Sequence, residues 1–458
     1  MTLSTGLQLN TRRRGGQLPP LGVVRFLAMC MLVCLSSCAS KCSQGQTTAC
    51  DPECPASFEC DEEARICVSD ALPLFTGDRV PGRAARIVSS SARLDAVVFA
   101  PVTRQVLVSS KDLVGGVWRW RVLSEDVKSG VTHLSLASSR DLTVVVWSDQ
   151  RGLYHLATQR VSTDPQQPLA WSTETIESGS YTASDDFDVV LRAGEPMIVF
   201  RDGESKSLMM LSRTSSEDGW RTSVIDDGSD VNVLKGCDAT VREQRGQGVG
   251  KHPDGVVLRS GLMAVAYYDQ DCGDLRLARQ QSDGAWQVRV LDQGDREGMS
   301  RHLTGQWPSL AQMQGSDELG IAYMDRTLGR LMFGHLGNEL FVRQVVDDGT
   351  RLTGSGQRVQ GSVGAFTTLS FDSNDRALIS YFDGYDIDAR FAVGSRSGED
   401  DTSFEWEHRA LFAEGATGLF VHHTLTASGV LVGVMESLVD GEQGKVSELH
   451  VVEQEVVQ

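Results

Sequence analysis

Five aspartates recur at one position of a short repeated phrase, and their type and spacing could support ligand chemistry. Each follows a hydrophobic pair, an aromatic residue and one further residue, as in Val145-Val146-Trp147-Ser148-Asp149. Carboxylates repeated along one rim could hold Ca²⁺ or a basic ligand. The alternative is structural, because an aspartate side chain can hydrogen-bond the backbone two residues on and stabilise a turn. The five residues are Asp149, Asp202, Asp269, Asp325 and Asp383.

A long insertion lies between the second and third copies of the phrase. The spacings between the five aspartates are 53, 67, 56 and 58 residues, and residues 228–250 account for the longest. The insertion contains two arginines, Arg242 and Arg245. Loops held on a rigid scaffold are where binding usually resides. We therefore predict one binding face, formed by Asp149, Asp202, Arg242, Arg245, Asp269, Asp271, Asp325 and Asp383.

The N-terminus has the pattern of an export signal. Arginines at 12–14 and 25 precede an apolar run over residues 26–35, which is too short to span a bilayer. The run ends in Leu35-Ser36-Ser37-Cys38. This resembles the lipobox of bacterial lipoproteins, and the resemblance implies that residues 1–37 are a signal peptide and that Cys38 is lipidated. Position 39 is Ala and not Asp, which by the same resemblance implies the outer membrane. The alternative is an ordinary secretory signal cleaved after Ala39.

A cysteine-rich module follows over residues 38–70. Five cysteines crowd into 26 residues, a density that in an exported chain indicates a disulfide-stabilised segment. The module resembles the EGF-like or knottin-like beads of some bacterial surface lipoproteins. Zinc is the competing interpretation, although no histidine lies between the cysteines. The odd count leaves one thiol over, and the pairing is open among Cys42, Cys50, Cys54, Cys60 and Cys67.

Two further cysteines, Cys237 and Cys272, stand far from the others. By the register of the repeats both lie in loops that open on the same face. A mutual disulfide is the economical arrangement for an exported chain, and two free thiols are the alternative. Such a bond would hold the long insertion over the predicted binding face.

The elements that position these residues are strands. Around each copy, apolar and polar residues alternate through four short segments rich in β-branched residues, and no stretch has a helical pattern. Four strands per unit of about 55 residues is the blade of a β-propeller. Two degenerate copies, at Ala96–Ala100 and at Val432–Glu436, flank the five clear ones and favour seven blades over six or eight. The fold class is therefore all-β, with a propeller over residues 71–458.

The last copy lacks room for a fourth strand. The segment Ala71–Val80 precedes the first copy and can supply that strand as an outer, edge strand. A blade shared by both ends of the chain would close the ring and remove a free sheet edge.

The repeats resemble the sialidase-type propellers. Ser216-Glu217-Asp218-Gly219-Trp220 and Ser282-Asp283-Gly284-Ala285-Trp286 are similar to shortened Asp-box turns. The resemblance implies a turn between the third and fourth strands, and a glycoside hydrolase as one candidate activity. The full box and the family's Phe-Arg-Ile-Pro motif are absent, so no catalytic residue is assigned. Glycoside hydrolysis needs two positioned carboxyl groups, which spacing alone cannot select among 61 acids.

The formal net charge of −18 excludes a nucleic-acid-binding protein, because such a surface repels phosphate. We expect a monomeric, lipid-anchored binding protein of the cell envelope whose ligand is an envelope protein, a polysaccharide or a peptide. No cofactor is expected beyond the Ca²⁺ that the aspartates could hold. The rival interpretation is a glycoside hydrolase on the same scaffold.

Overall fold

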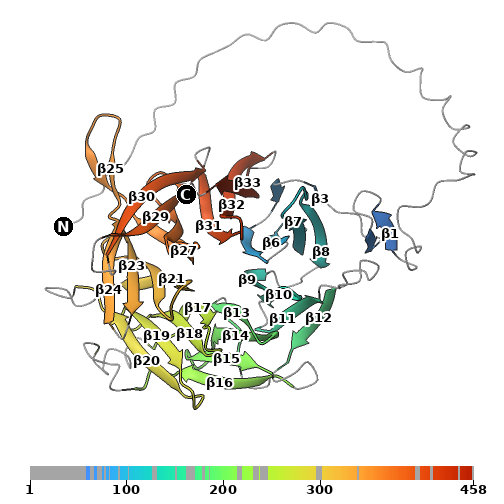
Figure 1. Cartoon of the computed structure of the whole chain (residues 1–458), viewed down its shortest axis with the longest axis horizontal. Coiled ribbons are helices and arrows are strands. Elements are labelled where there is room, and N and C mark those ends of the chain that lie inside the picture. The colour runs from blue at the N-terminus through green and yellow to red at the C-terminus, as the bar shows by residue number, and fades with distance from the viewer. Residues whose placement is uncertain are drawn as a thin grey trace, which may run out of the picture.

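The fold is described from a computed structural model of the chain (Figure 1). The structure describes residues 58–455, except for the short segments 62–65, 70–74, 77–78, 82, 91–92, 102, 126–130, 150–151, 161–170, 178–180, 185, 214–218, 231–236, 238–245, 296–301, 338–339, 398–402, 413–415 and 442–443. The predicted signal peptide 1–37 and the lipidation site Cys38 lie outside the described residues. So do three cysteines of the predicted stalk, Cys42, Cys50 and Cys54, and the two insertion arginines, Arg242 and Arg245.

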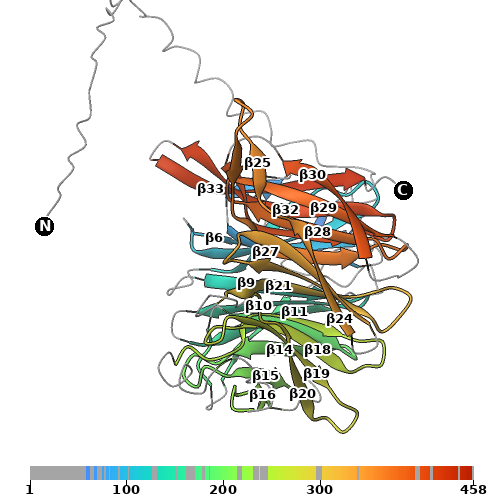
Figure 2. The same ribbon diagram turned by 90° about the vertical axis from the view of Figure 1, so that its left-hand side faces the viewer.

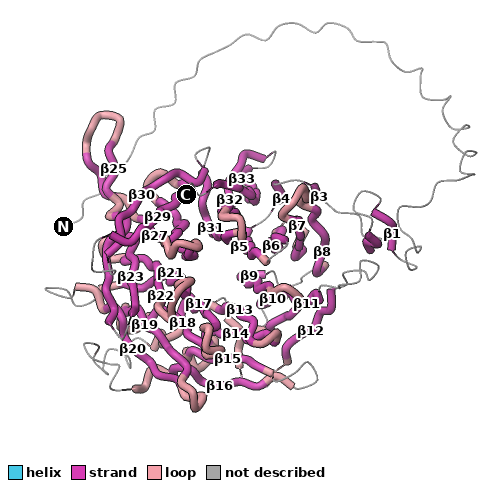
Figure 3. Tube along the Cα trace, viewed as in Figure 1, coloured by secondary structure: helices cyan, strands magenta, loops and turns pink. Residues whose placement is uncertain are grey.

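Seven antiparallel blades form a propeller, which confirms the predicted fold class. Each first strand contacts the first strands of the two neighbouring blades, so the innermost strands close a ring around one axis (Figure 1). Figure 3 shows strands and loops but no helix among the described residues. The described part of the chain therefore contains no helix that could cross a membrane.

The first three blades run in chain order from the innermost strand outward. The first contains β5 (Arg83–Ser89), β6 (Arg93–Ala100), β7 (Gln105–Asp112) and β8 (Arg119–Ser124). The second contains β9 (Val131–Ser138), β10 (Leu142–Asp149), β11 (Tyr154–Arg160) and β12 (Trp171–Ile176). The third contains β13 (Phe187–Arg192), β14 (Glu195–Arg201), β15 (Leu208–Ser212) and β16 (Arg221–Asp226).

The next three blades repeat this order. The fourth contains β17 (Lys251–Val257), β18 (Met263–Asp269), β19 (Asp274–Gln280) and β20 (Trp286–Asp292). The fifth contains β21 (Thr304–Gln312), β22 (Leu319–Asp325), β23 (Arg330–Gly337) and β24 (Leu340–Asp347). The sixth contains β27 (Val363–Phe371), β28 (Ala377–Asp383), β29 (Asp388–Ser397) and β30 (Ser403–Phe412).

The seventh blade joins both ends of the described chain. Its strands β31 (Ala416–Leu425), β32 (Val430–Gly441) and β33 (Gly444–Glu455) are completed by β4 (Arg79–Pro81), which pairs with residues 448–450 of β33. The completing strand is shorter than the predicted segment 71–80, since β3 (Phe75–Thr76) pairs instead with β8 of the first blade. One hydrophobic cluster spans the closure and includes Ile87, Trp120, Val434 and Leu449.

Two small hairpins lie outside the blades. One consists of β1 (Phe58–Asp61) and β2 (Ile66–Ser69) in the predicted stalk, where Cys60 and Cys67 are directly opposite each other in the backbone register. The other, of β25 (Thr350–Leu352) and β26 (Arg358–Gln360), connects the fifth and sixth blades. This second hairpin protrudes from the ring in both views (Figures 1 and 2).

The second strand of each blade is the most deeply buried. All eight residues of β10 are buried, as are all seven of β18 and of β22. A strand covered by neighbouring blades on both faces has no solvated side, so its sequence is continuously apolar up to the closing aspartate. In the sixth blade, the aromatic residue of the fourth strand packs against another strand of the same blade. There a Cβ on Gly394 would lie 2.5 Å from the ring of Trp406.

The innermost strands of five blades share one irregularity. A β-bulge places a non-glycine residue at positive φ in the first, fourth, fifth, sixth and seventh blades, at Ala84, His252, Trp307, Phe366 and Phe420. The left-handed conformation costs an L-residue roughly 1–2 kcal/mol. These bulges are therefore strained positions that the surrounding fold maintains.

A glycine precedes the bulge residue by two positions in four of these blades. Gly305 has a φ of 89°, and a Cβ there would lie 2.5 Å from the Cα of Leu275 in the preceding blade. Gly418 has a φ of 97°, with a Cβ only 2.4 Å from the backbone nitrogen of Ala389. No other residue type fits this approach, so the Gly-x-aromatic sequence seats each innermost strand against its neighbour.

Candidate functional site on the loop face and at the axis

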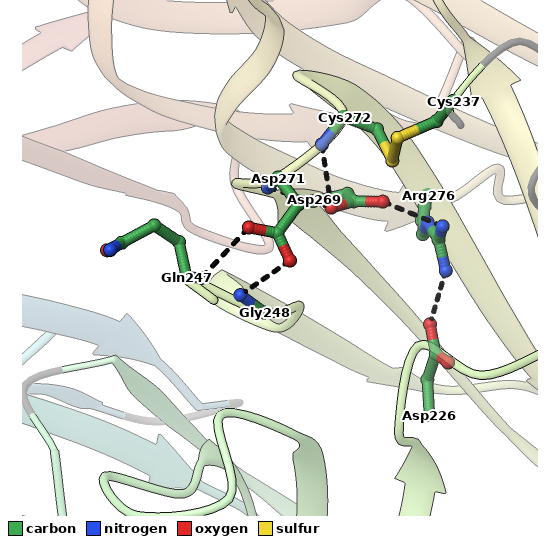
Figure 4. Close-up of a disulfide and its surroundings, with 8 residues drawn as sticks. All are labelled: Asp226, Cys237, Gln247, Gly248, Asp269, Asp271, Cys272 and Arg276. Atoms are coloured by element: carbon green, nitrogen blue, oxygen red, sulfur yellow. Dashed lines mark hydrogen bonds and ion pairs between the residues drawn. A yellow bond between two sulfur atoms is a disulfide. The ribbon is translucent and has the colours of Figure 1, made fainter. Parts of the chain in front are cut away.

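Cys237 and Cys272 form a disulfide with a Cα–Cα distance of 5.4 Å (Figure 4). Cys272 lies in the turn between β18 and β19, and Cys237 in the connection between the third and fourth blades. We call the side of the propeller that carries these two kinds of connection the loop face. The bond crosslinks residues 35 positions apart and fixes the insertion to the fourth blade.

Asp271 attaches the end of the same insertion. Its carboxylate accepts hydrogen bonds from the backbone nitrogens of Gln247 and Gly248, both at 2.9 Å (Figure 4). The insertion thus has two attachment points on the fourth blade, at Cys237 and at Gln247, just before β17 begins.

The five repeated aspartates are buried in turns, with exposed fractions of 5% or less. In each, a carboxylate oxygen accepts a backbone N–H from a residue two to four positions on, such as Cys272 or Asp271 for Asp269 and Tyr385 for Asp383. The carboxylates of Asp149, Asp202 and Asp325 accept hydrogen bonds in the same way. Their donors are the backbone N–H groups of Leu153, Ser205 and Leu328, respectively. This geometry accounts for their repetition as turn residues.

The second carboxylate oxygen is also engaged. Asp383 contacts Arg351 and Arg390 at 2.6 and 2.7 Å, and Asp325 contacts His302 at 2.8 Å. Burial opposes ionisation of Asp202, but backbone N–H groups of Thr182 and Ser205 lower its pKa below the ordinary value. Binding of Ca²⁺ or a basic ligand by these carboxylates stays a prediction, and such a ligand would have to displace these partners.

A second set of buried aspartates joins neighbouring blades. Each ends the fourth strand of one blade and accepts the hydroxyl of a buried tyrosine from the second strand of the next, with an arginine alongside. The three Asp–Tyr clasps, as we call them, are Asp226–Tyr267 at 2.6 Å with Arg276, Asp292–Tyr323 at 2.7 Å with Arg343, and Asp347–Tyr381 at 2.8 Å with Arg351.

Each clasp includes an arginine that pairs directly with its aspartate. Arg276 lies between Asp226 and Asp269 at 2.9 and 2.7 Å, and all three side chains are almost fully buried (Figure 4). Burial opposes ionisation of Asp347, but hydrogen bonds from Arg351, the Gly349 amide and Tyr381 lower its pKa to about 2. A carboxylate so stabilised supports the folded state at neutral pH.

A polar belt runs around the axis, formed by one residue from the innermost strand of each blade. In most blades this side chain hydrogen-bonds the next innermost strand: Asp188 accepts the Gly255 amide at 3.0 Å, and Ser309 accepts the Leu369 amide at 3.0 Å. The belt residues are Arg86, Ser135, Asp188, Asp254, Ser309, Thr368 and His422.

The belt contains one arginine and two aspartates that interact with one another. Arg86 interacts electrostatically with both Asp188 and Asp254, and burial lowers the pKa of this arginine. Burial raises the pKa of Asp188, and burial together with the neighbouring Asp188 raises the pKa of Asp254 to about 8. One cation thus faces two carboxyl groups, and at neutral pH one of them holds a proton.

Four aromatic side chains form an arc at the axis, two residues before the belt in successive blades. His252 stacks on Trp307 with ring centroids 5.0 Å apart, and Phe366 lies 5.4 Å from Trp307 and 4.6 Å from Phe420. All four side chains are partly exposed. We call them the axial arc.

The structure brings only some of the predicted face together. Asp269 and Asp271 lie beside the disulfide, whereas Asp149, Asp202, Asp325 and Asp383 occupy turns of other blades. The clasps, belt and arc were not predicted, although signals exist in the sequence. Tyrosine replaces tryptophan or phenylalanine in the repeated phrase where the preceding blade ends in Asp-x-Gly, and Gly-x-aromatic marks the arc at Gly250, Gly305, Gly364 and Gly418.

No protein-family model matches the sequence, and no curated protein matches it. Among solved structures, the chain is similar to the β-propeller domain of Myceliophthora thermophila Cps50 (Swd1), with a TM-score of 0.43, 11% identity, and coverage of 83% of this chain and 100% of that one.

Two further solved structures are similar at the same level. The polysaccharide lyase Uly1 has a TM-score of 0.46 and 8% identity, covering 83% of this chain and 90% of that one. A Trypanosoma rangeli sialidase mutant displaying trans-sialidase activity has a TM-score of 0.39 and 9% identity, covering 84% and 58%. The propeller assignment rests on the strand topology and not on these similarities.

Proposed function

We propose that this protein is an exported, lipid-anchored binding protein of the cell envelope that recognises its ligand on the loop face. The observation that carries the proposal is the insertion held by the Cys237–Cys272 disulfide and by Asp271. A disulfide favours an oxidising compartment, in agreement with the lipobox at Cys38. A loop pre-positioned on a rigid scaffold loses little conformational entropy when it binds.

The test of binding uses the full chain purified in detergent and arrays of envelope polysaccharides and peptides. Deletion of residues 232–247, combined with Cys272→Ser, should lower the affinity for the ligand more than tenfold. The melting temperature should change by only a few degrees. Deletion of residues 352–358, the tip of the protruding β25–β26 hairpin, is the matched control. An affinity unchanged by the first deletion would contradict the proposal.

The test of anchoring is separate. Metabolic labelling with radioactive palmitate in a bacterial host should label the natural chain, and Cys38→Ser should lose both the label and membrane association. Two or more acyl chains are needed for stable anchoring. An unlabelled chain that is nevertheless exported would favour ordinary signal cleavage after Ala39.

A second candidate is glycoside hydrolysis, and the belt carboxyl groups favour it. Asp254 holds a proton at neutral pH, and Asp188 is its neighbour, which is the pairing of an acid and a second carboxyl group that such hydrolysis requires. A screen of fluorogenic glycosides with the full chain decides between the two functions. Hydrolysis that disappears in Asp254→Asn would replace binding by catalysis as the main function.

A further inference from the structure

The axial arc is a continuous aromatic surface from four successive blades. Ring-centroid distances between successive members are 5.0, 5.4 and 4.6 Å, and Phe382 adds a fifth ring 6.4 Å from Phe366. The second strands of the same blades bury their aromatic residues almost completely, as Tyr267, Tyr323 and Tyr381 do. The arc therefore differs from the hydrophobic core in being accessible.

The bulge by itself does not require an aromatic residue. The first blade has the same bulge and the same positive φ, yet carries Ala84 there. The second and third blades have His133 and Asp186 two residues before the belt. Three large side chains are thus held in a conformation that L-residues rarely adopt, on one side of the ring only. Such strain directs attention to function and not to stability.

Three carboxyl groups lie in the surroundings of the arc. Asp186 accepts the backbone N–H of His252 at 3.1 Å, and Asp188 and Asp254 belong to the belt just below. The cations of this region are Arg86, which interacts with both belt aspartates, Lys251, whose Nζ lies 4.0 Å from Asp186, and Arg201, which acts electrostatically on His252 and donates to the carbonyl of Gln247. Burial and the neighbouring Asp188 raise the pKa of Asp254 to about 8, and a cation placed beside it would favour its ionised form.

We propose that the axial arc, together with Asp186, Asp188 and Asp254, binds the guanidinium or ammonium group of a basic peptide segment. The inference rests on the proposed binding role and names the ligand chemistry for the loop face. The faces of Trp307, Phe366 and Phe420 carry negative electrostatic potential that attracts a cation. His252 completes the stack as a neutral ring, because burial lowers its pKa to about 4.

Two observations support a cationic peptide as the occupant. The chain carries a formal net charge of −18, so a basic partner is attracted over long range. The same molecule already pairs an arginine with a partly exposed ring, since the guanidinium of Arg213 lies 4.8 Å from the centre of Trp220. The arc offers ring faces for the same kind of contact at several positions.

The experiment is a calorimetric titration of the full chain in detergent with three ten-residue peptides. The peptides alternate glycine with arginine, with citrulline or with glutamate, so that only the charge of the long side chain differs. We expect binding of the arginine peptide at low salt, at least tenfold weaker binding of the citrulline peptide, and none of the glutamate peptide. A progressive loss of affinity with added salt should accompany the specific binding.

Three variants locate the binding. Trp307→Ala and Phe366→Ala should each lower the affinity for the arginine peptide about tenfold, whereas Trp307→Phe should retain most of that affinity. Trp220→Ala is the matched control, because Trp220 is also partly exposed but lies outside the arc. Should an alanine variant fail to fold, the change in tryptophan fluorescence on adding the arginine peptide provides the same comparison. A saturable change in the natural chain that is lost in Trp307→Phe assigns the signal to Trp307 among the eight tryptophans.

The inference is overturned if the arginine peptide does not bind, if Trp307→Ala binds it as tightly as the natural chain, or if a neutral saccharide and not the peptide binds at the arc. Its failure is distinguishable from failure of the proposed function. Loss of peptide binding in the arc variants with no effect of deleting residues 232–247 would keep the arc and reject the insertion, and the reverse result would reject the arc alone.

Discussion

Asp347 and Asp254 are both carboxyl groups beneath the surface, but the two regions that hold them are built differently. In the clasp, Arg351, the Gly349 amide and Tyr381 lower the pKa of Asp347 to about 2 against the effect of burial. At the axis, burial and the neighbouring Asp188 raise the pKa of Asp254 to about 8. In the clasp the arginine bonds the aspartate directly, whereas at the axis Arg86 is shared electrostatically between Asp188 and Asp254 and does not outweigh burial.

The difference teaches which repeated residues maintain the ring and which are available to a ligand. The clasps recur at three successive junctions with the same residue types and complete partners. The axial positions keep the same backbone bulge but change residue type from Ala84 to His252, Trp307 and the two phenylalanines. The bulge geometry repeats but the side chains differ, so the axial surface is not the same in every blade. A ligand can therefore contact one side of the ring and not the other.

The largest expected effect tests the clasp region. Asp269→Ala removes one carboxylate from fully buried Arg276 and a backbone acceptor from the Cys272 turn. Breaking a buried ion pair on one side costs about 3–5 kcal/mol. Urea unfolding should show this loss, with exposed Asp283→Ala as a control below about 1 kcal/mol. A loss under 1 kcal/mol for Asp269→Ala would mean that Asp226 alone is a sufficient partner for Arg276.

The next effect tests the axis through pH. Between pH 4 and pH 8 the folded state keeps Asp254 protonated, since its folded pKa is about 8, while the unfolded chain ionises it. The folded state then binds more protons, so this group lowers stability as pH rises, by up to about 1.4 kcal/mol per pH unit. Asp254→Asn should lose this slope when unfolding is measured at pH 5 and pH 8. If the free energy of unfolding changes equally with pH in the variant and the natural chain, Asp254 is already ionised in the folded state.

The third effect compares the hydroxyl of a buried tyrosine with that of an exposed tyrosine. Tyr381→Phe leaves the oxygen of Asp347 without its hydroxyl donor inside the protein, which costs about 1–3 kcal/mol. Tyr385→Phe, on an exposed side chain, should change the free energy of unfolding very little. Chemical denaturation of both variants measures their free energies of unfolding. Equal losses would show that the Tyr381 hydroxyl does not stabilise the fold through the clasp.

The smallest effect returns to the arc. Trp307→Gly removes a partly exposed ring but relieves a positive φ of 46° that costs roughly 1–2 kcal/mol, so the net change should be about 1 kcal/mol. Trp147→Gly, at a buried core position, should lose about 3–5 kcal/mol. Thermal melting of the two variants separates them. Similar large losses would show that the arc is part of the core.

Several features of the site follow from the sequence by known rules. The repeated phrase predicts seven blades, and apolar second strands such as β18 predict their own burial. Residues 79–81 complete the last blade as a short strand, whereas the neighbouring residues 75–76 pair with the first blade, which pattern alone does not distinguish. The Ser282–Trp286 turn between the third and fourth strands also appears where the motif predicts it, with the Ala285 amide donating to Asp283.

The axial region could not be predicted in the same way. Asp254 and Asp188 are ordinary aspartates in the sequence. Burial at the axis raises the pKa of both, and the neighbouring Asp188 adds to the effect on Asp254. His252 and Trp307 are 55 residues apart in the chain and stack because their strands are adjacent in the ring. Contacts of this kind depend on the angle between blades, which no local pattern specifies.

By itself, the sequence determined the strands, their grouping into repeated blades and the turns that close them, because hydrophobic alternation and turn chemistry act over a few residues. Only the tertiary structure decided which buried carboxyl groups have a lowered pKa and which have a raised one. Burial and the pKa of a buried acid depend on neighbours brought together from distant parts of the chain, and those neighbours exist only once the ring has closed.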